Sequence, residues 1–302
     1  MHFIFEPGFF SNTTVRTALV LGLLVSVVSA AIGVFTVVRG QSFAGHALTD
    51  VATAGGAGAS LAVISPLIGF IGGGVLGAGA MDAIGVQRVK GRDIATGVVL
   101  GAATGLSALF LYLVTLQTST TGSTQTILFG SVFTVEPSTL PDALWLTALV
   151  LATLFIIRRP LMMSSISPEL AQSRGVRLRL VGLTFMVMLA VAVGLSAIVI
   201  GSILSTALLI GPPASALKFS NRFSTAVVFA SVLGTLATWL GIILAYDSYY
   251  WSASHRGLPV SFFVVSLVVA QFVVANVLAQ RRRVRVVHAT EHHATPEQVG
   301  WI

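Results

Sequence analysis

A histidine and an aspartate lie one helical turn apart in a stretch of small, mostly apolar residues. His46 and Asp50 are four positions apart at the start of the segment Gly45–Ala59. On a helix this spacing puts both side chains on one face. An imidazole and a carboxylate that face a common cavity can ligate a divalent cation, with waters or a second copy of the chain completing the shell. The alternative is that the two side chains pair with each other and fix helix packing.

The composition places this pair inside a membrane protein. Of 302 residues, 55% are hydrophobic and only 9% are charged, whereas soluble domains carry about 25% charged residues. Mean hydropathy is +0.93, so lipid is the natural solvent for most of the surface. There are no cysteines, which excludes disulfides and thiolate metal sites and leaves histidine, carboxylate and backbone oxygen as metal ligands.

Apolar runs divide the chain into nine predicted transmembrane helices of an all-α integral membrane protein. With the N-terminus outside and the C-terminus inside, every basic residue except Arg16 and Arg256 falls on the cytoplasmic side, in agreement with the positive-inside rule. We therefore expect one permease domain over residues 1–285 and a disordered, polar cytoplasmic tail over residues 286–302. Weak metal binding by its histidines is the alternative role of the tail. The nine runs are Thr17–Val38, Gly45–Val63, Pro66–Val86, Ile94–Leu116, Leu140–Ile157, Leu180–Ile200, Ile203–Leu217, Phe223–Tyr246 and Leu258–Gln280.

Two further places at membrane depth could belong to a transport pathway or a gate. Asp82 lies near the inner end of the third run, where it is either functional or an interfacial carboxylate close to Arg88. Pro212 and Pro213 interrupt the backbone hydrogen bonds of the seventh run. Such an interruption is tolerated in a membrane where protein or a water-filled path satisfies the freed carbonyls, so a packing kink and a pathway role both stay open.

A short capped helix is expected in the cytoplasmic connection after the fifth run. Ser167 is a suitable N-cap, Pro168 suits the first helical position, and Gly175 suits the C-terminal stop. Such a helix is a good docking element for a soluble partner, and an ordinary loop helix is the alternative. A second connection, Gln117–Leu140, contains an apolar stretch too short to span, which we expect to be a re-entrant or interfacial segment on the outer side.

Several function classes are excluded by what the chain lacks. It has no G-x-x-x-x-G-K-[ST] loop, no H-E-x-x-H and no Ser/His/Asp constellation. It is therefore not expected to be an enzyme on its own. Nucleic-acid binding is also not expected, because the basic residues occur in short clusters between apolar runs.

The order of motifs along nearly the whole chain resembles the permease subunits of metal-importing ABC transporters, the zinc, manganese and iron family. The family pattern places an aspartate first and a histidine four residues later, whereas His46 precedes Asp50 here. Asp93 matches an acidic start of a later span and is also a favourable residue at a helix N-terminus. The matching segments are Gly33–Gly45, Arg92–Gly97, Leu128–Ser131, Ser167–Gly175, Gly201–Ala216 and Leu258-Pro259.

The resemblance implies a homodimeric permease in the cell membrane with a metal path at the dimer centre. Zinc is the first expectation for the transported ion and manganese the second, with no permanently bound cofactor. His46 and Asp50 would form a transient metal site, an external metal-binding protein would deliver the ion, and ABC ATPase subunits would hydrolyse ATP. The rival interpretations are a secondary transporter driven by an ion gradient and a membrane scaffold without transport. The residues expected to contact the ATPase are Ser167, Pro168, Glu169, Leu170, Ala171 and Gly175.

Overall fold

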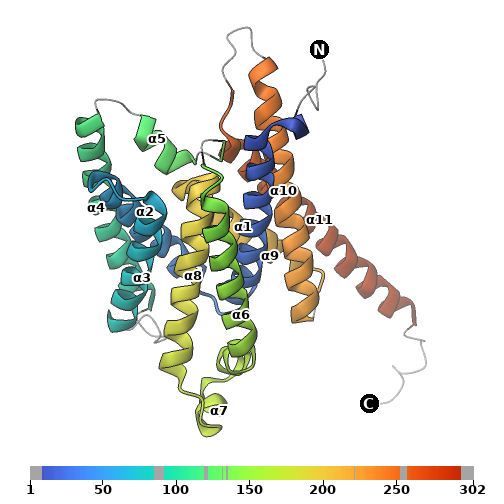
Figure 1. Ribbon diagram of the computed structural model, residues 1–302. Coiled ribbons are helices and arrows are strands. Elements are labelled where there is room, and N and C mark those ends of the chain that lie inside the picture. Colours follow the sequence, from blue (N-terminus) through green and yellow to red (C-terminus); the bar gives the residue numbers. More distant parts are fainter. Residues whose placement is uncertain are drawn as a thin grey trace, which may run out of the picture.

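The computed structural model describes residues 9–84, 92–118, 122–130, 132–133, 135–220, 222–251 and 257–293. In these residues all regular structure is helical, which confirms the predicted all-α class, and the helices form an elongated bundle (Figure 1). A 3₁₀ turn, Phe9–Ser11, precedes the α-helices. The helices are α1 Thr13–Val38, α2 Ser42–Leu61, α3 Pro66–Ile84, α4 Arg92–Thr118, α5 Gly122–Phe129, α6 Thr139–Ile166, α7 Pro168–Ser173, α8 Leu178–Ile200, α9 Ser202–Ala216, α10 Phe223–Trp251 and α11 Val260–His293.

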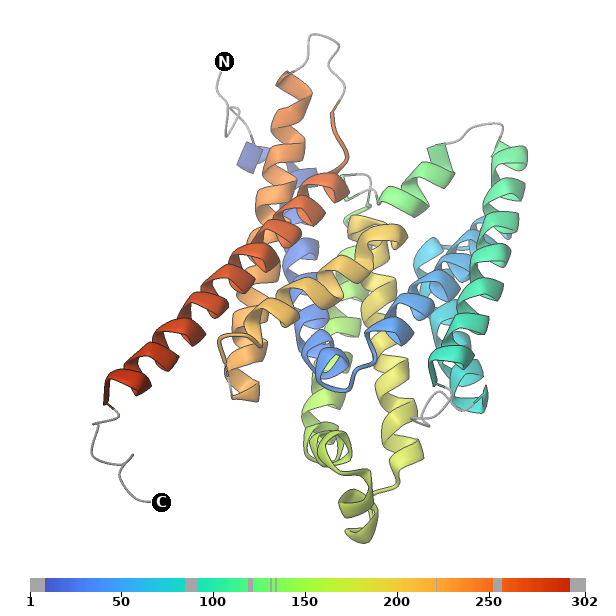
Figure 2. The same ribbon diagram turned by 180° about the vertical axis from the view of Figure 1, so that it is seen from behind.

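Seven described helices, rather than nine, are long and apolar enough to cross a membrane: α1, α3, α4, α6, α8, α10 and α11. The predicted count of nine is not supported. Helix α9 has only 15 residues, which corresponds to roughly 22 Å against about 30 Å of hydrocarbon. Helix α2 is long enough but too polar, because it contains His46 and Asp50 among many small residues. Both helices run obliquely in the bundle (Figure 2).

Helices α1 and α8 form the centre of the bundle. In their most apolar windows, 72% of α1 and 78% of α8 are buried, whereas the corresponding values for α4, α6 and α11 are 17–22%. Two buried hydroxyl pairs join α1 to its neighbours, Ser29 to Ser196 of α8 at 2.8 Å and Ser26 to Thr238 of α10 at 3.0 Å. Such interhelical hydrogen bonds satisfy polar groups that would otherwise face hydrocarbon.

Helices α2 and α3 pack almost backbone to backbone through a row of glycines. A Cβ atom added to Gly55 would lie 2.2 Å from the carbonyl oxygen of Gly69 and 2.7 Å from the Cα atom of Gly73. A Cβ atom on Gly77 would lie 2.6 Å from a methyl group of Val51. Only glycine permits this approach, and small residues at such spacing are typical of membrane helix contacts. We refer to the contact of Gly55, Gly69, Gly73 and Gly77 as the glycine seam.

Helix α5 has eight residues and contains the first part of the apolar stretch predicted to be too short to span. The helix is followed by Gly130, which has a φ of +80°. Gly130 packs against Gly201, which lies at the junction of α8 and α9 and has a φ of +92°. A Cβ atom on Gly130 would be 2.5 Å from the amide nitrogen of Gly201, so the two left-handed turns must both be glycine. This contact fixes α5 at the end of the molecule where α1 begins (Figure 1).

The domain boundary predicted at Arg285 stays a prediction. Helix α11 continues through His288 to His293, so the chain is helical beyond that boundary. The rest of the predicted tail, residues 294–302, lies outside the described residues.

Candidate metal site

Helix α2 is positioned by a tight turn after α1. Gly40 adopts φ +62° in this turn, which favours glycine. The Arg39 guanidinium donates to the side chain of Gln41 at 3.2 Å and to Ser164 and Ser165 at the end of α6 at 3.0 and 3.2 Å. The turn is thus tied to α6, and α2 starts from a fixed point.

His46 is half-buried and faces α9. Its Nδ1 atom lies 3.3 Å from Oγ1 of Thr206. The same Thr206 oxygen lies 3.2 Å from Oγ1 of Thr49, whose hydroxyl donates to the backbone carbonyl of Gly45 at 3.1 Å. One side of the imidazole is therefore engaged by a hydroxyl of a neighbouring helix.

Asp50 is also half-buried but meets a different helix. Oγ1 of Thr104 in α4 donates to Oδ2 of Asp50 at 2.7 Å, and Ser107 donates to the Asp50 backbone carbonyl at 3.0 Å. In the described part of the chain no ion pair joins His46 to Asp50. The alternative in which these two side chains simply pair with each other is therefore not the arrangement observed. Each is held by a threonine on a separate helix, α9 and α4.

One chain offers this site only two strong ligands. No group of three or more histidine, aspartate or glutamate side chains that could hold a metal ion is found among the described residues. An ion bound at His46 and Asp50 would need hydroxyls, backbone carbonyls, water or a second chain to complete its shell.

Asp82 lies at the end of α3 and pairs with Arg179 at the start of α8. The Arg179 Nε atom is 3.0 Å from Oδ2 of Asp82. The Asp82 side chain is 6% exposed and that of Arg179 is 80% exposed, so a nearly buried carboxylate is reached by an arginine from the surface. Arg88, the partner considered from the sequence, lies outside the described residues. The ion pair joins α3 directly to the helix that follows α7.

Pro212 and Pro213 are both buried inside α9. Pro213 has no amide hydrogen to donate to the carbonyl of Leu209 four residues earlier. That carbonyl lies against Gly33 of α1, because a Cβ atom on Gly33 would be 2.0 Å from the Leu209 oxygen and 2.7 Å from Cγ of Pro213. The prolines thus lie in a close contact between α1 and α9.

The capped cytoplasmic helix predicted from the sequence is α7. Ser167 accepts a hydrogen bond from the Leu170 amide at 3.3 Å, and Pro168 occupies the first turn. Gly175 ends the unit with φ +79°. Ala171 is fully buried, whereas Glu169 and Leu170 are exposed. The side chains of α7 that face solvent are therefore available for a partner.

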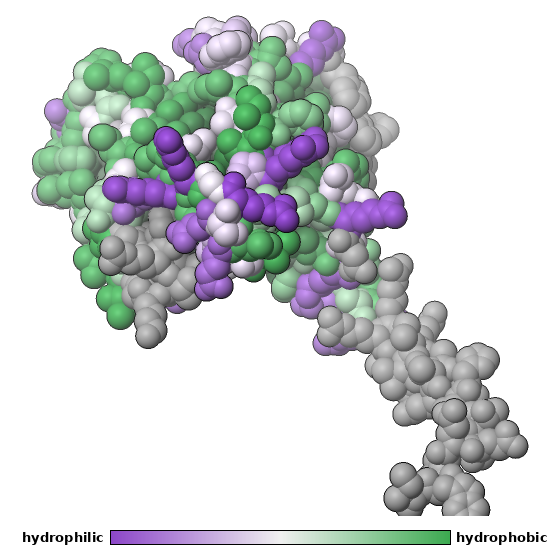
Figure 3. Space-filling view, turned by 90° about the horizontal axis from the view of Figure 1, so that it is seen from below, coloured by the Kyte–Doolittle hydropathy of each residue, from purple (hydrophilic) through white to green (hydrophobic). Residues whose placement is uncertain are grey.

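The end of the molecule that carries α7 exposes several basic side chains. Figure 3 shows hydrophilic side chains gathered at this end, around α7 and the adjoining ends of α6 and α8. The exposed basic residues of α6, α8 and the α7 connection are Arg158, Arg159, Arg174, Arg177 and Arg179.

Asp93 lies in the first turn of α4. This is the position at a helix N-terminus that was predicted for it, and it is favourable for a carboxylate.

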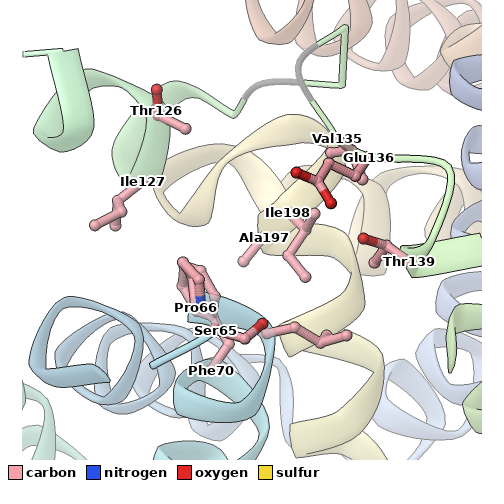
Figure 4. A pocket seen from close by; sticks show the side chains of 11 residues that line it. Ser65, Pro66, Phe70, Thr126, Ile127, Val135, Glu136, Thr139, Ala197 and Ile198 are labelled. Carbon is pink, nitrogen blue, oxygen red and sulfur yellow. The ribbon is translucent and has the colours of Figure 1, made fainter. Parts of the chain in front are cut away.

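A separate cavity of about 320 Å³ lies at the opposite end, between the start of α3, helix α5, the connection to α6 and the end of α8 (Figure 4). Its lining is mostly apolar and includes the rings of Pro66 and Phe70. Glu136 is its single charged lining residue, and its Oε2 accepts from Ser138 at 3.1 Å. His46 and Asp50 do not line this cavity.

Sequence reasoning missed the residues that hold the candidate ligands. Thr206 and Thr104 are threonines in apolar runs, and nothing local distinguishes them from threonines that bond to their own helix. Asp247 in α10 was also missed; its side chain is fully buried. It directly follows the apolar run Phe223–Tyr246, and that position was a usable signal, because an ionisable residue near membrane depth is costly.

Comparisons with known proteins agree on one group of relatives. The sequence model of the ABC 3 transport family matches residues 11–278 of this chain. The manganese import system permease protein ScaB of Streptococcus parasanguinis is 29% identical over 232 residues, which cover 77% of this chain and 81% of that protein. The high-affinity zinc uptake system membrane protein ZnuB of Haemophilus influenzae is 26% identical over 236 residues, covering 76% and 88%. Among solved structures, PsaBC from Streptococcus pneumoniae in complex with Fab has a similar fold, with a TM-score of 0.73 at 22% identity, covering 89% of this chain and 92% of that chain.

Proposed function

The chain belongs to the ABC 3 transport family, and from this premise we propose that it is the membrane permease of an ATP-driven importer for a divalent transition-metal cation. It is a multi-pass cell-membrane protein, and seven of its described helices could span. Relatives named for manganese and for zinc support a metal cargo. They leave Mn²⁺ and Zn²⁺ both as candidates, with Zn²⁺ first on the ligand chemistry of an imidazole and no sulfur.

The observation that carries the proposal is the position of His46 and Asp50 on α2. Both side chains are half-buried on α2, which among the described helices is long enough to span but too polar to be an ordinary span. Each is held by a single hydroxyl at one atom, which leaves the second imidazole nitrogen and the second carboxylate oxygen for an ion. A site with few strong ligands also suits transport, because a permeation site must release its ion.

The proposed assembly is a homodimer with two partners. Because one chain supplies only two strong ligands, a second copy facing the first would complete a shell at the dimer centre. The exposed surface of α7, at the basic end, is proposed to contact cytoplasmic ATPase subunits, and an external metal-binding protein would deliver the ion to the opposite end. The proposed orientation has the N-terminus outside and the C-terminus inside, because the positive-inside rule favours a cytoplasmic location for the basic end.

The test is uptake of radiolabelled Mn²⁺ and Zn²⁺ by cells expressing the wild type or the His46→Ala/Asp50→Ala double variant at equal membrane levels. Uptake of at least one ion should fall to background. The control is Ser60→Ala on the same helix, whose hydroxyl donates only to the carbonyl of Gly56, and it should leave uptake unchanged. Unchanged uptake in the double variant would contradict the metal site. Uptake that survives deletion of the ATPase would point to an ion-gradient transporter instead.

A further inference from the structure

Thr206 belongs to a chain of hydrogen bonds whose direction can be worked out from proton counting. A threonine hydroxyl has one proton to donate. The Thr49 hydroxyl donates its proton to the carbonyl of Gly45 at 3.1 Å, since a carbonyl can only accept. In the arrangement that gives each proton a single acceptor, Thr206 is the donor in the 3.2 Å contact between Thr49 and Thr206.

The single-acceptor arrangement decides where His46 carries its proton. In this arrangement Thr206 donates to Thr49, so the imidazole donates from Nδ1 in the 3.3 Å contact with Oγ1 of Thr206. Neutral His46 therefore carries its proton on Nδ1, and its Nε2 atom presents a lone pair. We name the sequence of donors from His46 through Thr206 and Thr49 to the Gly45 carbonyl the hydroxyl relay.

We infer that Thr206 is a positioning residue for the transported metal, because the hydroxyl relay holds His46 in the tautomer whose Nε2 atom binds a divalent cation. The inference rests on the proposed function for the metal and on the observed distances for the tautomer. Histidines that ligate metals generally donate their other ring N–H to a fixed acceptor, which orients the ring and selects the tautomer. Here the acceptor belongs to α9, so the orientation of a ligand on α2 depends on the contact between α2 and α9.

The relay also gives a reason for a threonine at each position. Thr49 is 1% exposed, and its hydroxyl bonds to its own helix while accepting from α9. A valine at position 206 would fill the same space but could not accept from Nδ1. The imidazole would then lose the partner that selects between its tautomers, and a serine would retain it.

The experiment measures the tautomer directly, in the full-length protein in lipid nanodiscs with isotope-labelled histidine. Nitrogen NMR shifts distinguish Nδ1–H from Nε2–H, and the His46→Gln variant assigns the His46 signal. We expect Nδ1–H in the wild type and in Thr206→Ser, and a mixture in Thr206→Val. The matched control is Thr53→Val, since the Thr53 hydroxyl donates only to the backbone carbonyl of Thr49, and it should keep the wild-type tautomer.

Calorimetric titration of the same samples with Mn²⁺ alone and with Zn²⁺ alone gives the second readout. Loss of a partner of this kind weakens metal affinity roughly 10- to 100-fold, and we expect that loss in Thr206→Val, with recovery in Thr206→Ser. A wild-type His46 with its proton on Nε2, or a Thr206→Val protein with unchanged tautomer and affinity, would overturn the inference. The tautomer needs no metal, so an Nδ1–H wild type whose uptake is unaffected by His46→Ala would overturn the proposed function while leaving the relay in place.

Discussion

The two sides of helix α2 are built in different ways. Toward α3 it meets backbone with backbone, and Gly55 and Gly69 leave no room for even a methyl group. Toward α4 and α9 it meets side chains, and there the hydroxyls of Thr104 and Thr206 contact it beside apolar groups such as the Phe110 ring. The backbone contact with α3 is lost if either helix shifts, whereas a hydroxyl that leaves α2 can be replaced by water or by another hydrogen-bond donor.

This difference indicates which helices move together. Interhelical hydrogen bonds in membranes contribute on average only about 0.6 kcal/mol, so the hydroxyl contacts of α2 can break and re-form at low cost. The glycine seam depends on close packing, which has no such alternative partner. We therefore expect α2 and α3 to move as one unit relative to α4 and α9, carrying His46 and Asp50 with them.

The unit has a connection to the end that carries α7. Helix α3 ends at Asp82, which Arg179 contacts at 3.0 Å from the start of α8. Because α8 follows α7 along the chain, a displacement of α7 by a partner can reach α3 through this ion pair. The chain of contacts then runs from α7 through α8 and α3 to the candidate ligands on α2.

The largest expected effect comes from adding one methyl group to the glycine seam. In Gly55→Ala the new Cβ atom would lie 2.2 Å from the Gly69 carbonyl oxygen, so the helices must separate at a cost of about 1–3 kcal/mol or more. We expect a clearly lowered melting temperature and loss of metal uptake. The matched control is Gly72→Ala on α3, because a Cβ atom there meets nothing within 4 Å. Equal behaviour of the two variants would show that the seam is not tightly packed.

An intermediate effect is expected from the ion pair between Asp82 and Arg179. Reversing one charge in Arg179→Asp puts two carboxylates together, which should lower uptake per ATP hydrolysed several-fold. Stability should change by less than about 1 kcal/mol, because the arginine is exposed to solvent. The double variant Asp82→Arg/Arg179→Asp should recover part of the coupling, and Arg177→Asp, on the same exposed turn, serves as the control. No recovery in the double variant would argue against transmission through this pair.

The sequence was sufficient for features that depend on local rules. Hydropathy predicted the helical class, and the caps Ser167 and Gly175 predicted α7 because capping is a property of a few adjacent residues. The spacing of His46 and Asp50 predicted one helix carrying both. The number of membrane-spanning helices could not be predicted from the sequence. Apolar content alone does not distinguish a helix that crosses the membrane from a short helix such as α9 or a polar one such as α2.

Features that depend on contacts between distant segments could not be predicted. The partners of His46 and Asp50 lie 160 and 54 positions away along the chain, and a threonine in an apolar run carries no sign of which helix it will face. The same is true of Asp82, which pairs with Arg179 at a sequence separation of 97. Helix packing decides these pairs, and packing is a property of the whole bundle.

The smallest expected effect belongs to the hydroxyl side of α2. Thr104→Val removes the 2.7 Å hydrogen bond to Asp50, but the half-buried carboxylate can accept from water instead, and the Thr104 hydroxyl already shares its proton with the Leu100 carbonyl. A loss of about 0.6 kcal/mol corresponds to a change of roughly threefold in apparent metal affinity, measured as the concentration giving half-maximal uptake. Thr115→Val, on the same helix but bonded to α5 rather than α2, is the control and should match the wild type. Thr104→Val could instead lower metal uptake as much as Gly55→Ala. The contacts of α2 with α4 would then be as fixed as those with α3, and α2 and α3 could not move as a unit relative to α4.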